Sequence, residues 1–432
     1  MQFRGPVAAI ATVATVLALT ACGGGGGGGG GGGTTGGSSG GSDKTLSTSD
    51  ADNPKGNVSW CIGKDTTGAF AAMVKKFNDA NPNATVKLIE LPTSADQQRA
   101  QQVQRLRAKS TECDILGIDP IWMAEYVSQG WLYDLTDVLT PRKSKFIGST
   151  IESARYQGKY WAIPFNTNAG FLYYRTDKVK TAPKTWQQVY QDAKTSGGLV
   201  YQGARYEGLT VNFLELLYTA GGKAISDDGK KATLDSPEAK EVLTFMQNGV
   251  KDGAVSHSVS TYQEEESRRA FEAGKAALMR QWPYAYALGQ KSPIKGKFKI
   301  TPLPGWNDKP ASGVIGGYNL AVNAYSKNPG TALAFAQFVT QPKQQEYMAA
   351  KTTLPPTLSA TYDSPAVKKV MPFASELRKA VAQAHPRPLS PVYPQISEAI
   401  YNNVYNALWS GASVDSALKK ANDQINQALK TF

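Results

Sequence analysis

The sequence predicts an α/β fold, in which strand-like and helix-like segments alternate to build a doubly wound parallel sheet. From Val58 onward, short apolar runs alternate with longer segments of helical periodicity. The largely apolar run Cys113–Ile118 is typical of a central parallel strand, and it ends at Asp119-Pro120. A chain of 432 residues also has room for two domains of about 100 to 200 residues each.

The N-terminal segment has the features of an export signal. An arginine at position 4 precedes a small-apolar run, Val7–Leu19, and about 13 residues are too few to span a bilayer. The run ends in Leu19-Thr20-Ala21-Cys22, which resembles the lipobox of bacterial lipoproteins, where lipid is attached to the cysteine. An ordinary secretory signal with a chance cysteine is the alternative. We expect a signal peptide over residues 1–21 and a lipidated, Gly/Ser-rich tether over residues 22–55.

Five elements are expected in order after the tether, three strands separated by two helices. The first helix is indicated by apolar residues at i, i+3, i+4 and i+7, and Asn-Pro-Asn ends it. The segments are the strand Val58–Ile62, the helix Gly68–Asn81, the strand Thr85–Leu91, the helix Ala95–Ala108 and the strand Cys113–Ile118.

Two cysteines remain after Cys22, and both fall in predicted strands. In a flavodoxin-like order the first and third strands are neighbours, about 5 Å apart, which is within disulfide range. Export to an oxidising compartment allows pairing. We therefore predict a Cys61–Cys113 disulfide, with two reduced core cysteines as the alternative.

Two carboxylates are expected at the same edge of this sheet. Asp65 lies in the turn after the first strand, and Asp119 directly follows the third. Ligands of open α/β sheets bind at the carboxyl ends of the strands. The alternative for Asp119 is that it only caps the helix that begins at Pro120.

The charge and the motifs of the chain argue against nucleic-acid binding and against the common hydrolase and metal-site classes. The net charge of +12 would suit an anionic partner, but the basic residues are scattered and export argues against nucleic acid. The chain has two histidines, His257 and His385, and it lacks G-x-S-x-G, H-E-x-x-H and any Cys/His set with metal spacing. We expect no cofactor, no metal and no enzymatic activity.

Four later segments resemble extracellular solute-binding proteins of ABC importers, in the carbohydrate-binding group that includes maltose- and trehalose-binding proteins. The resemblance covers about residues 56–432 and is carried by residues 158–175, 261–286, 313–341 and 387–393. It implies a type II periplasmic-binding-protein-like fold of two lobes, each a doubly wound sheet flanked by helices, joined by a multi-crossing hinge. The first crossing would break at Pro164, and a third is expected near residue 372.

The resemblance also implies lobe boundaries and a ligand site. The N-lobe would comprise residues 56–166 and 318–372, and the C-lobe residues 167–317 and 373–432. Sugars need polar groups for their hydroxyls, aromatic faces for their C–H patches, and glycines where the backbone approaches. The candidates are Asp65, Asp119, Asn168, Glu265 and Arg387 for hydroxyls, Trp282 and Tyr284 for stacking, and Gly316 and Gly317 for close approach.

Several assignments stay open. Asn166 competes with Asn168, and two of the three glutamates at positions 264–266 are expected to be solvated helix-cap residues. Tyr286 and Trp306 are interpreted as core.

The expected function is that of a lipid-anchored, extracytoplasmic monomer, which binds a disaccharide such as trehalose or a related α-glucoside for the transmembrane subunits of an ABC permease. A glycan hydrolase with paired carboxylates and an adhesive lipoprotein are the alternatives.

Overall fold

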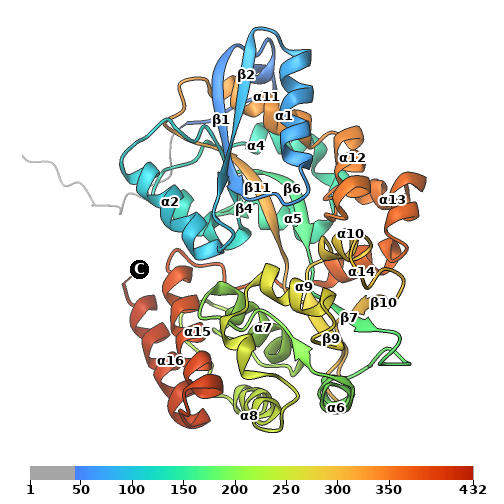
Figure 1. The fold of residues 1–432 in the computed structure, drawn as a ribbon. Helices are drawn as coiled ribbons and strands as arrows, with labels where there is room; N and C mark the ends of the chain where they lie inside the picture. Colours follow the sequence, from blue (N-terminus) through green and yellow to red (C-terminus); the bar gives the residue numbers. More distant parts are fainter. Residues whose placement is uncertain (1–43, 432) are drawn as a thin grey trace, which may run out of the picture. The chain divides into compact units, whose positions relative to one another are not determined.

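The computed structural model describes residues 44–431. The predicted signal peptide, Cys22 and most of the tether lie outside these residues. Two sheets organise the described chain (Figure 1). We call the elements around the five-stranded sheet the first lobe and those around the four-stranded sheet the second lobe.

The sheet of the first lobe has the order β2-β1-β3-β11-β6. Both neighbours of β1 are parallel to it, as the sequence predicts, whereas β11 is antiparallel to β3 and to β6. The sheet is therefore mixed rather than purely parallel. Its strands are β1 (Gly56–Gly63), β2 (Ala84–Leu91), β3 (Ile115–Ile118), β6 (Ile163–Asn168) and β11 (Gly316–Val322).

The sheet of the second lobe has the order β10-β7-β9-β8, and only β8 and β9 are parallel. Its strands are β7 (Phe171–Arg175), β8 (Leu199–Val200), β9 (Leu278–Gln281) and β10 (Phe298–Pro302), and a small hairpin, β4 (Arg155–Tyr156) with β5 (Lys159–Tyr160), precedes the first crossing.

The chain passes between the sheets where β6 leads into β7 and where β11 begins. The expected break at Pro164 is absent, because β6 runs through it. This proline is tolerated for two reasons: β6 is an edge strand, and the pairing with β11 shifts register between Tyr318 and Asn319, opposite Pro164. The third crossing near residue 372 stays a prediction.

The first two helices of the first lobe are those predicted from the sequence. The first begins after Gly68 (φ 76°) and buries Phe70, Met73 and Phe77 against the sheet. The helices are α1 (Ala69–Ala80), α2 (Ala95–Arg107), α3 (Met123–Ser128), α4 (Thr136–Leu139), α5 (Gly148–Ser153), α11 (Pro329–Val339) and α12 (Pro342–Thr352), with 3-10 turns η1 (Thr48–Ala51), η2 (Pro120–Trp122) and η3 (Thr140–Lys145).

The second lobe is more helical, and α15 and α16 pack on α7 and α8 (Figure 1). Its helices are α6 (Trp186–Ser196), α7 (Glu207–Thr219), α8 (Pro237–Lys251), α9 (Glu264–Glu272), α10 (Ala285–Gly289), α15 (Tyr393–Trp409) and α16 (Val414–Leu429), with η4 (His257–Thr261). The segment η5 (Ser359–Asp363), α13 (Pro365–Val370) and α14 (Ala374–Gln383) adds Val367 and Leu377 to the same buried core. The residue boundaries of the lobes stay a prediction.

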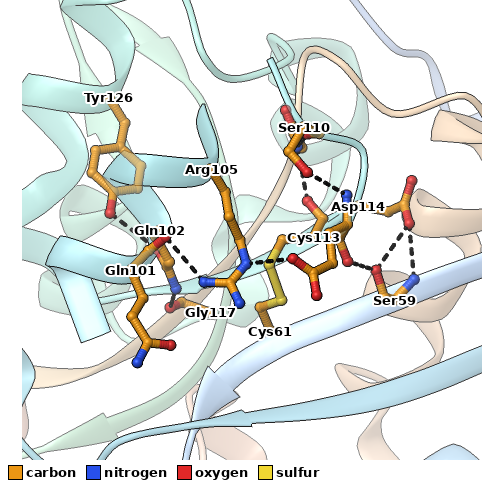
Figure 2. The surroundings of a disulfide bond; sticks show 12 residues. Ser59, Cys61, Gln101, Gln102, Arg105, Ser110, Cys113, Asp114, Gly117 and Tyr126 are labelled. Carbon is orange, nitrogen blue, oxygen red and sulfur yellow. Dashed lines mark hydrogen bonds and ion pairs between the residues drawn. A yellow bond between two sulfur atoms is a disulfide. The ribbon is translucent and has the colours of Figure 1, made fainter. Parts of the chain in front are cut away.

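A disulfide between Cys61 and Cys113 confirms the predicted pairing (Figure 2). The two Cα atoms are 5.4 Å apart, and both side chains are buried. The third strand starts at Ile115, later than expected. The carbonyl of Cys113 accepts a hydrogen bond from Asn323 Nδ2 at 2.9 Å, so a side chain takes the place of a strand partner there.

Candidate functional site

A cavity of about 420 Å³ lies between residues of the first and second lobes. All of the predicted ligand residues border it, from both lobes: Asp65, Asp119, Asn168, Glu265, Trp282, Tyr284, Gly316, Gly317 and Arg387. Residues more than 300 positions apart in the sequence, such as Asp65 and Arg387, thus meet at one site.

Asp65 lies in the loop between β1 and α1, and its carboxylate accepts hydrogen bonds from other residues of that loop and from the start of α1. One carboxylate oxygen accepts from the backbone N–H of Thr67 at 2.8 Å and from its hydroxyl at 2.5 Å, and the other accepts from the N–H of Phe70 at 2.9 Å. The loop between β1 and α1 is therefore ordered by the same carboxylate that borders the cavity. Part of the hydrogen-bonding capacity of Asp65 is already used.

Asp119 does cap the turn that follows it, but capping is not its only contact. Its Oδ1 caps η2 by accepting from the N–H of Ile121 at 3.2 Å, and it also accepts from Arg387 Nη2 at 2.6 Å. Burial raises the pKa of Asp119 to about 6, although Arg387 lowers it, and nearby Glu207 raises it further.

Arg387 is 5% exposed and joins carboxylates of the two lobes. Its Nη1 donates to Glu207 Oε1 at 2.7 Å, while its Nη2 pairs with Asp119 of the first lobe. Its Nε is buried and has no partner among the described residues. Nη2 also donates to the carbonyl oxygen of Ile315 at 3.3 Å, so each terminal nitrogen of Arg387 already has a protein partner.

Glu207 connects this ion pair to a further acid. Its carboxylate also accepts from the hydroxyls of Tyr393, at 2.7 Å, and Ser397, and its backbone N–H donates to Asp96 Oδ2 at 3.0 Å. Burial and then Glu207 raise the pKa of Asp96 to about 6. We refer to Asp96, Asp119, Glu207 and Arg387 as the Arg387 network.

The two asparagines of β6 have different surroundings. Asn166 Oδ1 accepts from the backbone N–H of Tyr318 at 2.7 Å, so that side chain joins the crossing strands. The Oδ1 of Asn168 is buried without a partner among the described residues. An unpaired buried acceptor at a cavity is available to a ligand donor, which favours Asn168.

The three glutamates at the start of α9 all border the cavity, and the expected role of a solvated cap residue applies to Glu266. They share the first turn of the helix, which faces the cavity. Glu266 does cap, since it accepts from the N–H of Gln263 at 3.2 Å, and it pairs with Arg269.

The other two glutamates differ in how their oxygens are used. Glu265 accepts from Tyr284 at 2.8 Å and pairs with Arg268 at 2.7 Å; burial raises its pKa, but these hydrogen bonds lower it by more. Glu264 accepts from the Tyr206 hydroxyl at 2.7 Å and pairs with no cation among residues 44–431, and burial raises its pKa. Glu264 is thus as strong a candidate as the predicted Glu265.

The glycines serve the crossing as well as the cavity. Gly317 has φ 111°, and a Cβ there would lie 2.3 Å from the carbonyl oxygen of Asn166. At Gly316 a Cβ would meet the Trp282 ring at 3.4 Å. Close approach of strand to strand, rather than of backbone to ligand alone, requires glycine at position 317.

Sequence reasoning missed several lining residues because their neighbourhood gave no local signal. Tyr206 is the N-cap of α7 and Glu207 its first residue, and neither stands out from the mixed polar and apolar sequence of this helix. The missed residues include Gln98, Tyr206, Glu207 and Tyr318. Trp306 is buried, as expected for core, and Tyr286 is partly buried against the core.

No helix between residues 44 and 431 has both the length and the apolar character needed to cross a bilayer. Within the same range no three His, Cys, Asp or Glu side chains gather as a metal site would require.

Comparison with known proteins gives a consistent result. The model of the family described as bacterial extracellular solute-binding protein matches residues 63–346. A Deinococcus radiodurans protein described as a probable ABC transporter-binding protein is 36% identical over 394 residues, which are 85% of this chain and 93% of that protein.

Solved structures resemble the chain over nearly their whole length. The maltose-bound MalE3 of T. maritima is 33% identical with a TM-score of 0.81, over 87% of this chain and 99% of the other. The GacH receptor of Streptomyces glaucescens, solved without ligand and with acarbose, is 23% identical with a TM-score of 0.78, over 88% of this chain and 99% of GacH. The second likeness concerns the fold alone.

Proposed function

Since this chain belongs to the family of bacterial extracellular solute-binding proteins, we propose that the solute it binds for an ABC sugar importer is a disaccharide, such as trehalose or a related α-glucoside. The expected type II, two-lobe α/β fold is confirmed by the comparison with maltose-bound MalE3. What is proposed is the identity of the sugar, the residues that hold it and the attachment to the membrane.

The observation that carries the proposal is the joint lining of one cavity by an indole and by polar groups of both lobes. An aromatic face covers the C–H patches of a pyranose, and carboxylates and amides pair with its hydroxyls. A volume of about 420 Å³ falls within the usual range for small-ligand pockets, roughly 300 to 1,000 Å³. Maltose, the ligand of the similar MalE3, is itself an α-linked disaccharide.

The proposed binding residues are those named from the sequence, with Glu264 added. Asp65 and Asp119 act from the first lobe, and Trp282, Glu265 and Arg387 act from the second. A sugar that contacts both lobes binds the closed arrangement more tightly than the open one, so it shifts the population toward closure. The closed form is then the form that the permease recognises.

The proposed membrane attachment is through lipid on Cys22. In this proposal the tether keeps the folded lobes at the outer face of the cell membrane. Metabolic labelling with a radioactive fatty acid tests it: the wild-type protein should be labelled and membrane-bound, and Cys22→Ser should be neither. Label on the Cys22→Ser variant would contradict the assignment.

A melting-temperature screen with trehalose, maltose, other disaccharides and monosaccharides tests the choice of ligand. A ligand that binds only the folded state at 100 times its Kd adds about 2.7 kcal/mol of stability. We expect α-linked disaccharides to raise the melting temperature most. A rise with none of them would overturn the proposal, and cleavage of a sugar during incubation would favour the hydrolase alternative.

A further inference from the structure

A buried ion pair lies directly behind the predicted stacking residue. Arg280 of β9 is 1% exposed, and it donates from Nε and Nη2 to the two carboxylate oxygens of Glu215 at 2.7 and 2.5 Å. Its remaining terminal nitrogen, Nη1, donates to Gln202 Oε1 at 3.0 Å. The guanidinium is therefore held at a fixed position by three hydrogen bonds.

The Arg280 guanidinium stacks on the indole of Trp282, with 3.9 Å between Cζ and the ring centroid. Trp282 borders the cavity, whereas Arg280 does not. A cation over one face of an indole is attracted by the ring electrons, and more strongly where water is excluded. The stack therefore restrains the tilt of the ring at the cavity wall.

The other end of the pair lies beside both segments that cross between the sheets. A Cβ at Gly170, between β6 and β7, would lie 2.3 Å from Glu215 Oε1 and 2.8 Å from Arg280 Nη2. Burial raises the pKa of Glu215, while Arg280 and, on the return segment, the backbone of Val314 lower it, which places Val314 near the carboxylate. The ion pair thus lies against the indole and Gly170 and near the return segment.

We infer that Arg280 is a positioning residue, which holds the Trp282 ring in register with the crossing segments through Glu215 and so sets the affinity for the stacked sugar. This inference rests on the proposed function. A lysine would keep the charge but lose both the planar stack and the two-pronged contact with Glu215. Arg280→Lys is therefore the informative substitution.

Arg175 provides a matched control. It is also buried, at 8% exposure, it lies on the neighbouring strand β7, and it makes an equivalent two-pronged contact with Asp177 at 2.8 and 2.6 Å. It does not border the cavity. Arg175→Lys should change overall stability without changing Trp282 or sugar binding.

The first experiment needs no sugar. The chain is labelled with 5-fluorotryptophan, and the Trp282 fluorine resonance is assigned as the one missing from Trp282→Phe. Arg280→Lys should shift or broaden that resonance, and Arg175→Lys should not. An unchanged Trp282 resonance in Arg280→Lys overturns the inference. If Arg280→Lys does not fold, Glu215→Gln, which loosens the hold on Arg280, takes its place with the same expected result.

The second experiment measures maltose and trehalose affinity by calorimetry in a double-mutant cycle. Arg280→Lys should weaken binding up to about tenfold in the wild type, because a ring that is no longer held must be ordered when the sugar binds, and it should have no further effect in Trp282→Ala. Equal losses in both backgrounds would mean that Arg280 acts by general stability, against the inference. If neither sugar binds the wild type, the choice of ligand fails, and the fluorine result still decides the role of Arg280.

Discussion

Arg387 illustrates how a charge is kept inside a protein. Its guanidinium is almost fully buried and lies between Asp119 and Glu207, which come from different lobes. Removing one partner of such a buried group leaves the other uncompensated, which usually costs more than the pair itself contributes. Substitutions in the Arg387 network are therefore expected to affect both stability and binding, and the two effects need separate measurements.

Asp119→Ala should lower the sugar affinity by about 1 to 3 kcal/mol, the usual penalty for leaving buried polar partners unpaired. Titration calorimetry measures the loss, and a thermal melt verifies that the variant is folded. Asp79→Ala, at an exposed position of α1, is the control and should bind normally. Unchanged affinity in Asp119→Ala would remove Asp119 from the site.

Asp96 should make stability depend on pH. Burial and Glu207 raise its pKa from 3.8 to about 6, so between these values the folded state holds more protons than the unfolded state. Stability from this group therefore increases as the pH falls through about 6, and its destabilising effect is largest at neutral pH.

Asp96→Asn keeps an oxygen for the N–H of Glu207 and removes the charge. We expect a higher melting temperature than wild type at about pH 7.5 and a smaller difference at about pH 5. Asp79→Asn, which loses an exposed carboxylate beside Lys75, should show no such pattern. A difference from wild type that is the same at both pH values would contradict the assignment.

The pairing of the two crossing strands, β6 and β11, requires their backbones to lie very close together at Gly317. Because a side chain at Gly317 would overlap the backbone of Asn166, Gly317→Ala should lower the free energy of unfolding by about 3 kcal/mol or more. Gly229→Ala is the control: it has φ 71° and no heavy atom within 4 Å of the new methyl, so only left-handed strain of about 1 to 2 kcal/mol applies. Urea unfolding measures both losses. If Gly317→Ala and Gly229→Ala lose similar free energy of unfolding, the neighbouring backbone has moved to accommodate the methyl group at position 317, and the prediction is wrong.

The disulfide joins β1 to the segment that leads into β3, across 52 residues. In the chain-entropy model, closing a loop of this length stabilises the folded state by about 4 kcal/mol. Replacing both cysteines by alanine should therefore lower the free energy of unfolding by several kcal/mol in urea. An unchanged midpoint and slope would show that the bond contributes nothing to stability.

For the whole molecule, the proposed mechanism predicts closure on the sugar. Maltose or trehalose should decrease the radius of gyration measured by X-ray scattering, because a ligand held by both lobes stabilises the closed form. Trp282→Ala at the same sugar concentration should show a smaller change. If a bound sugar leaves the scattering of the wild type unchanged, binding occurs without closure.

Much of the fold was predictable from the sequence because its determinants are local. The period of apolar residues in α1 and the apolar run before Asp119 follow from spacing along the chain, and the strand order around β1 follows from the usual order of doubly wound sheets. The resemblance of short segments indicated the family, and it also supplied candidate ligand residues, which border the cavity. The expected strand break at Pro164 was wrong, because a distant strand decides the structure there: the shifted pairing with β11 lets β6 continue through the proline.

The sequence by itself thus determined the type of fold, the disulfide and which residue types surround the cavity. Only the tertiary structure decided how those residues are used: Asp119 is shared between a cap and Arg387, Asn166 is tied to a crossing strand, and Glu264 stands without a cation among the described residues. Hydrogen-bond partners far apart in the sequence leave no local pattern, because their choice depends on geometry that exists only after both lobes have folded.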